Sequence, residues 1–443
     1  MHEELNTKQV EARDRSLDFV INNNDYPYNF MVSGLAGTGK TTTLVAVVEA
    51  LKEAGFKPAV CTPTGKAAHV INQKQSGFIA TTLHRVLTAR PIDKHAQVHS
   101  RLDDLSMAEQ ARELTPEEKT EQQELLVQLD THTTNRLKFQ PVDIESFLTK
   151  YDVLVFDEAS MIGRETYDEL ISRIPVPKLF FGDAAQLPPV QDKPAVDLKG
   201  AHVRLIDIMR QDPSSGILPV SHFIQRKGDY PKLKEIAQYS DITVRKDFAP
   251  EMVKGFEHEH QILCWKNVTR HTVSRMIREA RNVPVDAAFP YLPAIGEQFM
   301  IDENDDEKRL LKGQLLTMQK IIMFRPNANP FMATVKATDE SGNERNLTIG
   351  LTDLVEGYGV DLNVSQNTVL NNIRWAERNA IKVMFPYCLT VHKAQGSEWD
   401  KVLYLAEMPQ GNPEWRKHAY TAVTRAAKEV VICDYAFRFD KTG

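Results

Sequence analysis

Short apolar runs alternate with amphipathic stretches over the first part of the chain. The runs lie at residues 30–33, 59–62, 153–156 and 178–181, and residues 41–54 between the first two have a helical period. Runs of this length and composition are typical of buried strands. Their alternation with helices predicts a mostly parallel sheet, whose ligands bind in loops at the carboxyl ends of the strands.

A second region with the same alternation begins near residue 192. Its apolar runs lie at residues 261–265, 386–391, 401–405 and 430–433, and a helix is predicted over 268–281. Residues 301–385 interrupt this region with short β-like runs, such as 314–323. Those runs predict a small antiparallel barrel inserted into the second α/β unit.

Residues 89–145 interrupt the first region in the same way. Residues 102–129 are strongly charged and have a helical period, which predicts surface helices. The flanking segments 91–94 and 136–141 are expected to pair as a small β-hairpin. The helix predicted at 268–281 carries Arg270, Arg275, Arg278 and Arg281, for which a solvated face is favoured over a nucleic-acid contact.

Composition bounds the class of protein without choosing a function. A chain of 443 residues with 42% hydrophobic and 26% charged residues is a multidomain globular protein. No stretch approaches the roughly 20 apolar residues of a membrane span, and the N-terminus does not resemble a signal peptide, so a cytoplasmic location without membrane contact is expected. The four cysteines each sit in an apolar run, which predicts buried thiols and no disulfide.

The net charge of −6 neither supports nor excludes nucleic-acid binding. Residues 101–130 hold nine acids and three bases, so this segment alone accounts for the imbalance. The remainder of the chain is close to neutral and leaves room for a local basic channel.

The segment from Gly34 to Thr41 fits the pattern G-x-x-x-x-G-K-[ST] between a predicted strand and a predicted helix. Glycines let successive backbone N–H groups and the helix N-terminus face a phosphate. Lys40 is expected to neutralise the β- and γ-phosphates, and the Thr41 hydroxyl is expected to ligate magnesium. ATP and Mg²⁺ are therefore predicted, with a phosphate cradle made of Gly34, Ala36, Gly37, Thr38, Gly39, Lys40, Thr41 and Thr42.

Two further polar segments follow predicted strands. Asp157 and Glu158 come directly after the run 153–156, where Asp157 would hold the magnesium and Glu158 would polarise the attacking water as general base. Gln186 follows the run 178–181 and is placed to sense the γ-phosphate or to orient water. The alternatives are an ordinary acidic loop and a turn built from Gly, Asp and Pro.

In their order along the chain, these motifs resemble those of superfamily 1 helicases, specifically the RecD-like branch that includes Dda. The resemblance covers nearly the full length. It adds similarity to the glutamine motif at 5–9, motif Ia at 62–68, motif Ib at 82–84, motif IV at 208–211, motif V at 389–398 and motif VI at 420–425.

The resemblance implies an α/β fold of two RecA-like P-loop motor domains. A helical and β-hairpin insertion would interrupt the first, and a small SH3-like β-barrel would interrupt the second. The corresponding division is 1–88 with 146–191 for the first motor domain, 89–145 for its pin or wedge insertion, 192–300 with 386–443 for the second motor domain, and 301–385 for the barrel.

The resemblance also assigns residues around ATP. Gln9 would read the adenine, and Gln395, Gly396 and Glu398 would face the nucleotide from motif V. Arg210 and Arg425 would supply positive charge to the γ-phosphoryl group across the cleft between the domains. For both arginines the alternative is a surface salt bridge.

Nucleic-acid contacts follow from motif position in the same way. They are expected on the first domain at Pro63, Thr64, Lys66 and His84, and on the second at Thr390 and His392. Phe139 is the single Phe, Tyr or Trp between residues 89 and 145 and is the predicted tip of a pin that holds a separated base pair. A buried anchor for the insertion is the alternative for Phe139.

The implied activity is an ATP-dependent DNA helicase that moves 5′ to 3′ on single-stranded DNA as a monomer and opens a duplex fork. Replication or recombination proteins would be its partners, in the host cytoplasm if a phage encodes it. One alternative is a DNA-dependent ATPase that remodels protein–DNA complexes without processive unwinding. Two alternatives of other classes are a P-loop phosphotransferase and an inactive structural subunit.

Overall fold

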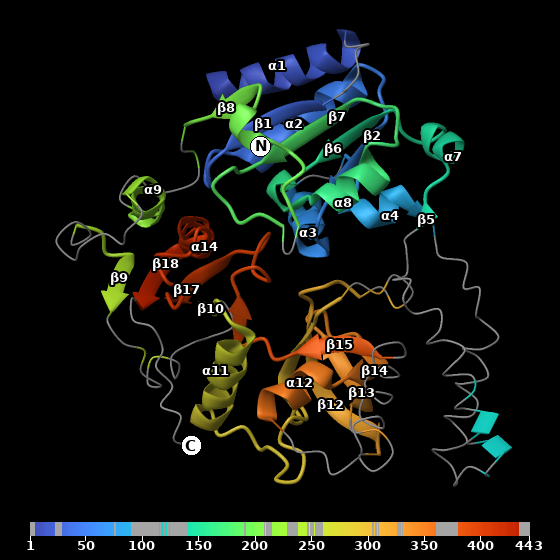
Figure 1. The fold of residues 1–443 in the computed structure, drawn as a ribbon, viewed down its shortest axis with the longest axis vertical. Coiled ribbons are helices and arrows are strands. Elements are labelled where there is room, and N and C mark those ends of the chain that lie inside the picture. The colour runs from blue at the N-terminus through green and yellow to red at the C-terminus, as the bar shows by residue number, and fades with distance from the viewer. Residues whose placement is uncertain are drawn as a thin grey trace.

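The computed structural model describes eleven main segments of the chain. They are residues 5–22, 29–74, 77–89, 140–189, 192–207, 215–227, 238–245, 260–303, 310–325, 331–359 and 380–433, with small gaps at 304, 306–307 and 309 and isolated described positions between segments. They form two α/β lobes and a barrel (Figure 1).

The first lobe is built on a six-stranded parallel sheet with the order β3-β2-β6-β7-β1-β8. Its strands are β1 (Asn29–Gly34), β2 (Pro58–Thr62), β3 (Ala80–Thr82), β6 (Val153–Phe156), β7 (Lys178–Gly182) and β8 (Val203–Leu205). The helices are α1 (Thr7–Asn22), α2 (Lys40–Glu53), α3 (Gly65–Lys74), α4 (Leu83–Leu87), α7 (Ile144–Leu148) and α8 (Arg164–Thr166). The four apolar runs are central strands because helices and loops cover both faces of the sheet, as the two core clusters on either side of it show.

Strand β8 extends the first sheet beyond the division drawn from the sequence. Val203 to Leu205 pair in parallel with β1, although the range 192–300 was assigned to the second motor domain. The strand is only three residues long and carries an arginine at its centre. Its apolar signal was therefore too short to show which sheet it joins.

The second lobe has a five-stranded parallel sheet with the order β16-β10-β17-β18-β9. The strands are β9 (Ile242–Arg245), β10 (His260–Cys264), β16 (Cys388–Thr390), β17 (Trp399–Leu405) and β18 (Ala426–Cys433). The helices are α9 (Ile217–Lys227), α11 (Asn267–Ala280) and α14 (Trp415–Val423). Helix α14 lies on the side of this lobe that faces the first lobe (Figure 1). The predicted pair of parallel sheets is confirmed.

A closed barrel separates β10 and α11 from β16 along the chain. It consists of β11 (Gln298–Ile301), β12 (Leu315–Phe324), β13 (Met332–Asp339), β14 (Glu344–Gly350) and β15 (Ile381–Met384). The predicted barrel is confirmed, but it is not wholly antiparallel because β14 and β15 run parallel. Helix α12 (Thr352–Tyr358) follows β14 and helps the chain return to the end from which β14 started.

At the base of the insertion, β4 (Thr88–Ala89) pairs antiparallel with β5 (Gln140–Pro141). This ladder begins before residues 91–94, the segment expected to pair. Those four residues, residues 136–139 and most of the charged stretch 102–129 lie outside the described part of the chain.

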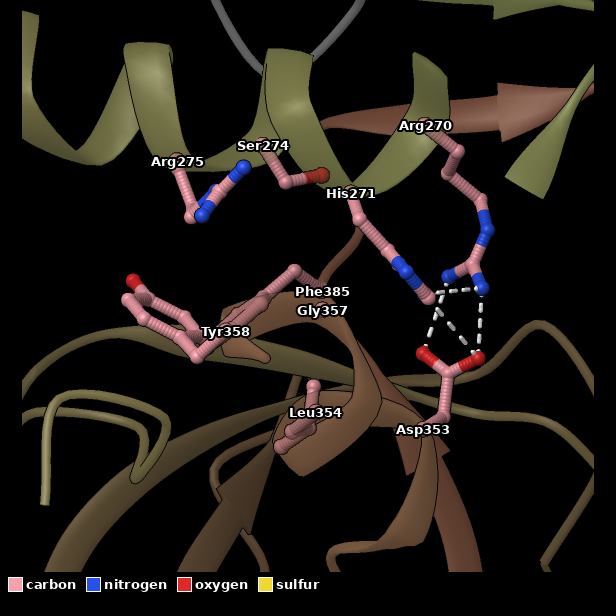
Figure 2. Close-up of a pocket in the computed structure, with 9 residues that line it drawn as sticks. All are labelled: Arg270, His271, Ser274, Arg275, Asp353, Leu354, Gly357, Tyr358 and Phe385. Carbon is pink, nitrogen blue, oxygen red and sulfur yellow. Dashed lines mark hydrogen bonds and ion pairs between the residues drawn. The ribbon is translucent and has the colours of Figure 1, made fainter. Parts of the chain in front are cut away.

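The barrel is joined to the second lobe by two buried arginines of α11. The Arg270 guanidinium donates to both carboxylate oxygens of Asp353 on α12, at the edge of a small pocket (Figure 2). The Arg278 guanidinium binds Glu297 through Nε and Nη2, at 2.7 and 2.9 Å. Arg270 is 2% exposed and Arg278 is 1% exposed. The expected solvated face is therefore wrong for these two arginines, because the barrel covers it.

Two smaller expectations concern thiols and membranes. Cys61, Cys264, Cys388 and Cys433 are all buried free thiols, as predicted. Among the described residues, no helix combines the length and the apolar character that crossing a bilayer requires.

Candidate active site: the cleft between the lobes

The phosphate loop connects β1 to α2 at the carboxyl edge of the first sheet. Gly37 and Gly39 have positive φ angles of 79° and 76°, which glycine adopts without strain. A Cβ at Gly34 would lie 2.4 Å from Thr38 Oγ1, so the loop closes on itself too tightly for a side chain there. The loop therefore presents backbone N–H groups ahead of the helix N-terminus, which is the arrangement that binds phosphate.

Lys40 points back into this loop. Its ammonium donates to the carbonyl oxygens of Gly34 and Leu35, at 2.9 and 3.0 Å. It also lies 3.9 Å from the carboxylate of Asp183, which is fully buried. The lysine is thus already held at the loop that would wrap the phosphates.

Gln9 lies against the phosphate loop. Asn6 and Gln9 form a reciprocal capping box at the start of α1, in which each side chain accepts from the backbone N–H of the other. The Gln9 amide also donates to the Thr38 carbonyl at 3.3 Å. A Cβ at Gly39 would lie 2.2 Å from Gln9 Nε2, so this glycine also allows the glutamine to approach.

Asp157 and Glu158 stand at the end of β6, at the same sheet edge. Glu158 has a φ of 49°, a left-handed conformation that is uncommon for a residue with a side chain and often marks a functional site. Its backbone N–H donates to Asp157 Oδ1 at 2.9 Å, which holds the Asp157 carboxylate against the Glu158 backbone. Within the described part of the chain, Glu158 Oε2 is buried without a hydrogen-bond partner.

Gln186 and Asp183 belong to the loop after β7. Gln186 is 2% exposed, and its Oε1 is a second buried oxygen without a partner among the described residues. Two such oxygens beside a phosphate loop fit a site for a magnesium nucleotide and its attacking water, because isolated buried polar atoms are costly. Asp183, which the sequence analysis did not single out, accepts from the N–H of Ala185 and stands beside Lys40.

Two parts of the second lobe, α14 and motif V, contribute residues to this site. The Tyr420 hydroxyl accepts from the N–H of Ala36 in the phosphate loop and donates to Asp183 Oδ2, both at 2.8 Å. Leu187 is held on both sides: its N–H donates to Thr421 Oγ1 at 3.1 Å, and its carbonyl accepts from Gln395 Nε2 at 3.1 Å. These four hydrogen bonds join the two lobes at the phosphate loop and the loop after β7.

Arg425 lies just after α14, at the end of motif VI. It is 7% exposed and donates to the carbonyls of Thr421 and Ser397 and to the Thr424 hydroxyl, all within the second lobe. Its expected alternative, a surface salt bridge, does not fit this burial. Arg210 lies outside the described residues.

Thr64 and Lys66, two of the residues expected to contact nucleic acid, lie where motif Ia meets the second lobe. A Cβ at Gly396 would be 3.1 Å from Thr64 Oγ1, so the two motifs touch across the lobes. The Lys66 ammonium lies 4.6 Å from the ring centroid of Trp399, and burial lowers the pKa of this lysine. Burial also lowers the pKa of His84 and His392, which favours neutral imidazoles at both positions.

The other residues expected to contact nucleic acid differ in how deeply they are buried. Pro63 is partly buried, and Thr390 is buried with its hydroxyl accepting from the Lys393 N–H at 3.4 Å. Glu398 is exposed. Phe139, the predicted pin, lies outside the described residues.

Family models match both halves of the cleft. Residues 24–247 match an AAA domain, and residues 385–433 match a UvrD-like helicase C-terminal domain. The chain belongs to the superfamily 1 helicases, in the branch of RecD and Dda.

Known proteins support this membership in sequence and in fold. The chain is 26% identical over 407 residues to the ATP-dependent RecD2 DNA helicase of Deinococcus radiodurans, covering 89% of this chain and 45% of that protein. It is 27% identical over 166 residues to the ATP-dependent DNA helicase dda of Enterobacteria phage T4, covering 37% of this chain and 29% of that protein. The chain thus spans less than half the length of these curated relatives.

Solved Pif1 structures share the fold. Bacteroides Pif1 bound to single-stranded DNA superposes with a TM-score of 0.50 at 17% identity, over 97% of this chain and 92% of that one. Pif1 from Candida albicans gives a TM-score of 0.50 at 15% identity, over 97% and 95%. The predicted fold class and family are confirmed. Asp183, Tyr420 and Thr421 were missed, although Tyr420 and Thr421 lie in motif VI and Asp183 lies between the run 178–181 and Gln186.

Proposed function

We propose that this superfamily 1 helicase hydrolyses ATP to move 5′ to 3′ along single-stranded DNA and to separate duplex DNA. The observation that carries the proposal is the hydrogen bonding of Tyr420, Thr421 and Gln395 to the first lobe beside the phosphate loop. A phosphotransferase with one P-loop domain gives no role to such contacts from a second α/β lobe. The names of the relatives, RecD2, dda and Pif1, support DNA as the substrate.

The roles proposed for the first lobe follow from its geometry. Lys40 and the N–H groups of Gly37 to Thr42 hold the phosphates, and Gln9 reads the base. Thr41 and Asp157 would hold Mg²⁺, which supplies charge neutralisation on the phosphates when bound. Glu158 takes a proton from the attacking water, and the Gln186 amide orients that water.

The second lobe supplies the remaining charge. Arg425 reaches the γ-phosphoryl group as the cleft closes, together with Arg210, and Gly396 and Glu398 line the same edge. Because closure depends on the nucleotide, hydrolysis is converted into relative motion of the lobes. A strand lying across both lobes is then gripped in turn by Pro63, Thr64, Lys66, His84, Thr390 and His392.

We further propose that the barrel and the insertion assist strand separation at the duplex fork. The division is 89–145 for the insertion and 301–385 for the barrel, with the first motor domain extended to include β8. Opening each base-pair step costs about 1.4 kcal/mol in stacking, so a wedge at Phe139 would assist separation. The chain would act as a monomer on a single strand joined to a duplex.

The decisive test uses duplexes with a 5′ or a 3′ single-stranded tail, with ATP hydrolysis followed in parallel. We expect hydrolysis stimulated by single-stranded DNA and unwinding of the 5′-tailed substrate. Lys40→Ala should abolish both activities, whereas Lys52→Ala, at the far end of the same helix, should retain both. Stimulated hydrolysis without unwinding of either substrate would instead indicate a remodelling translocase.

A second variant separates unwinding from hydrolysis. Phe139→Ala should lose unwinding while it keeps DNA-stimulated hydrolysis, because a pin contributes to strand separation and not to ATP chemistry. Equal loss of both activities would contradict the pin assignment and favour a buried anchor.

A further inference from the structure

We infer that the Tyr420 hydroxyl is a positioning group that places Arg425 relative to the phosphate loop, so that catalysis depends on this bridge between the lobes. The inference rests on the proposed ATP hydrolysis. Tyr420 does not reach the reacting atoms itself. It acts through the segment of the second lobe that carries Arg425.

Both hydrogen bonds of the Tyr420 hydroxyl cross from the second lobe to the first. It accepts from the Ala36 N–H and donates to Asp183 Oδ2, each at 2.8 Å. Both Tyr420 and Asp183 are 0% exposed, so neither bond competes with water. A hydroxyl has one donor and few acceptor sites. Here its single oxygen atom connects the phosphate loop to the loop after β7.

Asp183 links this bridge to the charge at the phosphates. Its Oδ2, which accepts from Tyr420, lies 3.9 Å from the Lys40 ammonium. The γ-phosphate of a bound nucleotide would compete with Asp183 for Lys40 and would repel the carboxylate. We therefore expect the strength of the Tyr420 bond to Asp183 to depend on the bound nucleotide.

The path from Tyr420 to Arg425 is short and hydrogen-bonded throughout. The Thr424 N–H donates to the Tyr420 carbonyl at 3.0 Å, and Arg425 Nε donates to the Thr421 carbonyl at 3.2 Å. The last turn of α14 thus couples the position of Tyr420 to the position of the Arg425 guanidinium. The ring of Tyr420 packs with Ala36, Ala185 and Leu218, so a phenylalanine would keep this packing and lose only the hydroxyl.

The chain offers a matched control in Tyr404. This tyrosine is also 0% exposed, and its hydroxyl is 2.9 Å from His418 Nδ1 within the second lobe. Tyr420→Phe and Tyr404→Phe each remove one buried hydroxyl from the same lobe. They differ in whether the hydroxyl bridges to the phosphate loop.

The experiment measures kcat and KM for ATP at saturating single-stranded DNA, together with the thermal unfolding temperature, for the full chain and both variants. A hydrogen bond to a charged group corresponds to about ten- to a hundredfold. We expect kcat of Tyr420→Phe to fall by about that factor with KM changed by less than about threefold, because the arginine acts in the transition state. Tyr404→Phe should keep kcat within about twofold.

The inference is overturned if Tyr420→Phe retains kcat, if only KM changes, or if Tyr404→Phe loses as much kcat. Should Tyr420→Phe not fold, Asp183→Ala tests the same bridge, since it removes the carboxylate that accepts from the Tyr420 hydroxyl. A wild-type kcat in Asp183→Ala would then overturn the inference. Failure of the proposed function looks different, because the wild-type chain itself would show no DNA-stimulated hydrolysis.

Discussion

The second lobe meets the first lobe through single hydrogen bonds, and it meets the barrel through buried ion pairs. At the cleft, Tyr420, Thr421 and Gln395 each contribute one or two bonds to the first lobe. At the barrel, Arg270 and Arg278 each bind a carboxylate through two nitrogens. Single bonds can break and reform during a cycle, whereas separating a buried ion pair leaves charges without partners. We therefore expect the contacts between the two lobes to change during the cycle and the barrel junction to stay closed.

The largest effect is expected from Arg425→Ala. Loss of an arginine that acts on the γ-phosphoryl group lowers kcat by roughly 10³–10⁵. Arg275→Ala, which removes an arginine over the Tyr358 ring at the barrel junction, should leave kcat within about threefold. Steady-state ATP hydrolysis with saturating single-stranded DNA measures both variants. Similar kcat losses in the two would show that the cleft and the barrel junction are not functionally distinct.

The next largest effect is expected on stability from Arg278→Ala. The change leaves the Glu297 carboxylate buried without its cation, which costs about 3–5 kcal/mol in the free energy of unfolding. The double variant Arg278→Met with Glu297→Leu should regain much of that loss, since no charge remains buried. Arg281→Ala, at the exposed end of the same helix, is the control and should change stability by less than about 1 kcal/mol. Urea unfolding checks this ordering, and a double variant as unstable as the single one would contradict it.

Acid should weaken the barrel junction through Asp353. Burial raises the pKa of this carboxyl, but hydrogen bonds from His271 and Arg270 outweigh burial and hold the pKa well below its usual range. A folded-state pKa below the unfolded value means that the stabilisation is complete above about pH 4 and is lost as pH falls through the folded-state pKa. Relative to Asp353→Asn, the wild type should lose on the order of 2 kcal/mol between pH 5 and the acid limit. A parallel pH dependence in the two proteins would show that Asp353 is not responsible.

The smallest effect is expected from Thr421→Val at the cleft. Valine keeps the shape but cannot accept from the Leu187 N–H, which costs about 1–2 kcal/mol in the closed cleft and lowers kcat by about tenfold. Thr269→Val, which removes a buried hydroxyl bonded to Glu407 within the second lobe, should affect stability without lowering kcat. A Thr421→Val protein with normal kcat would indicate that the bonds around Leu187 do not contribute to closure.

Much of the site was predictable because its residues belong to contiguous motifs or come directly after predicted strands. The strand, the glycines and Lys40 of the phosphate loop are contiguous, so the motif alone indicates the cradle. Asp157, Glu158 and Gln186 each follow an apolar strand, and parallel strands bring their carboxyl ends to one edge. The positions of Arg270 and Arg278 were misread because their partners, Asp353 and Glu297, are distant in the chain, and a helix rich in arginine looks solvated until the barrel covers it.

Period, turn chemistry and motif order are enough to predict a P-loop site, two parallel α/β units and an inserted barrel. The folded chain was needed to show that Tyr420 joins Ala36 to Asp183, that β8 completes the first sheet, and that α11 buries two arginines. The physical reason is that hydrogen bonds and ion pairs between distant segments depend on how the lobes pack. A local pattern of apolar and polar residues carries no record of a partner hundreds of residues away.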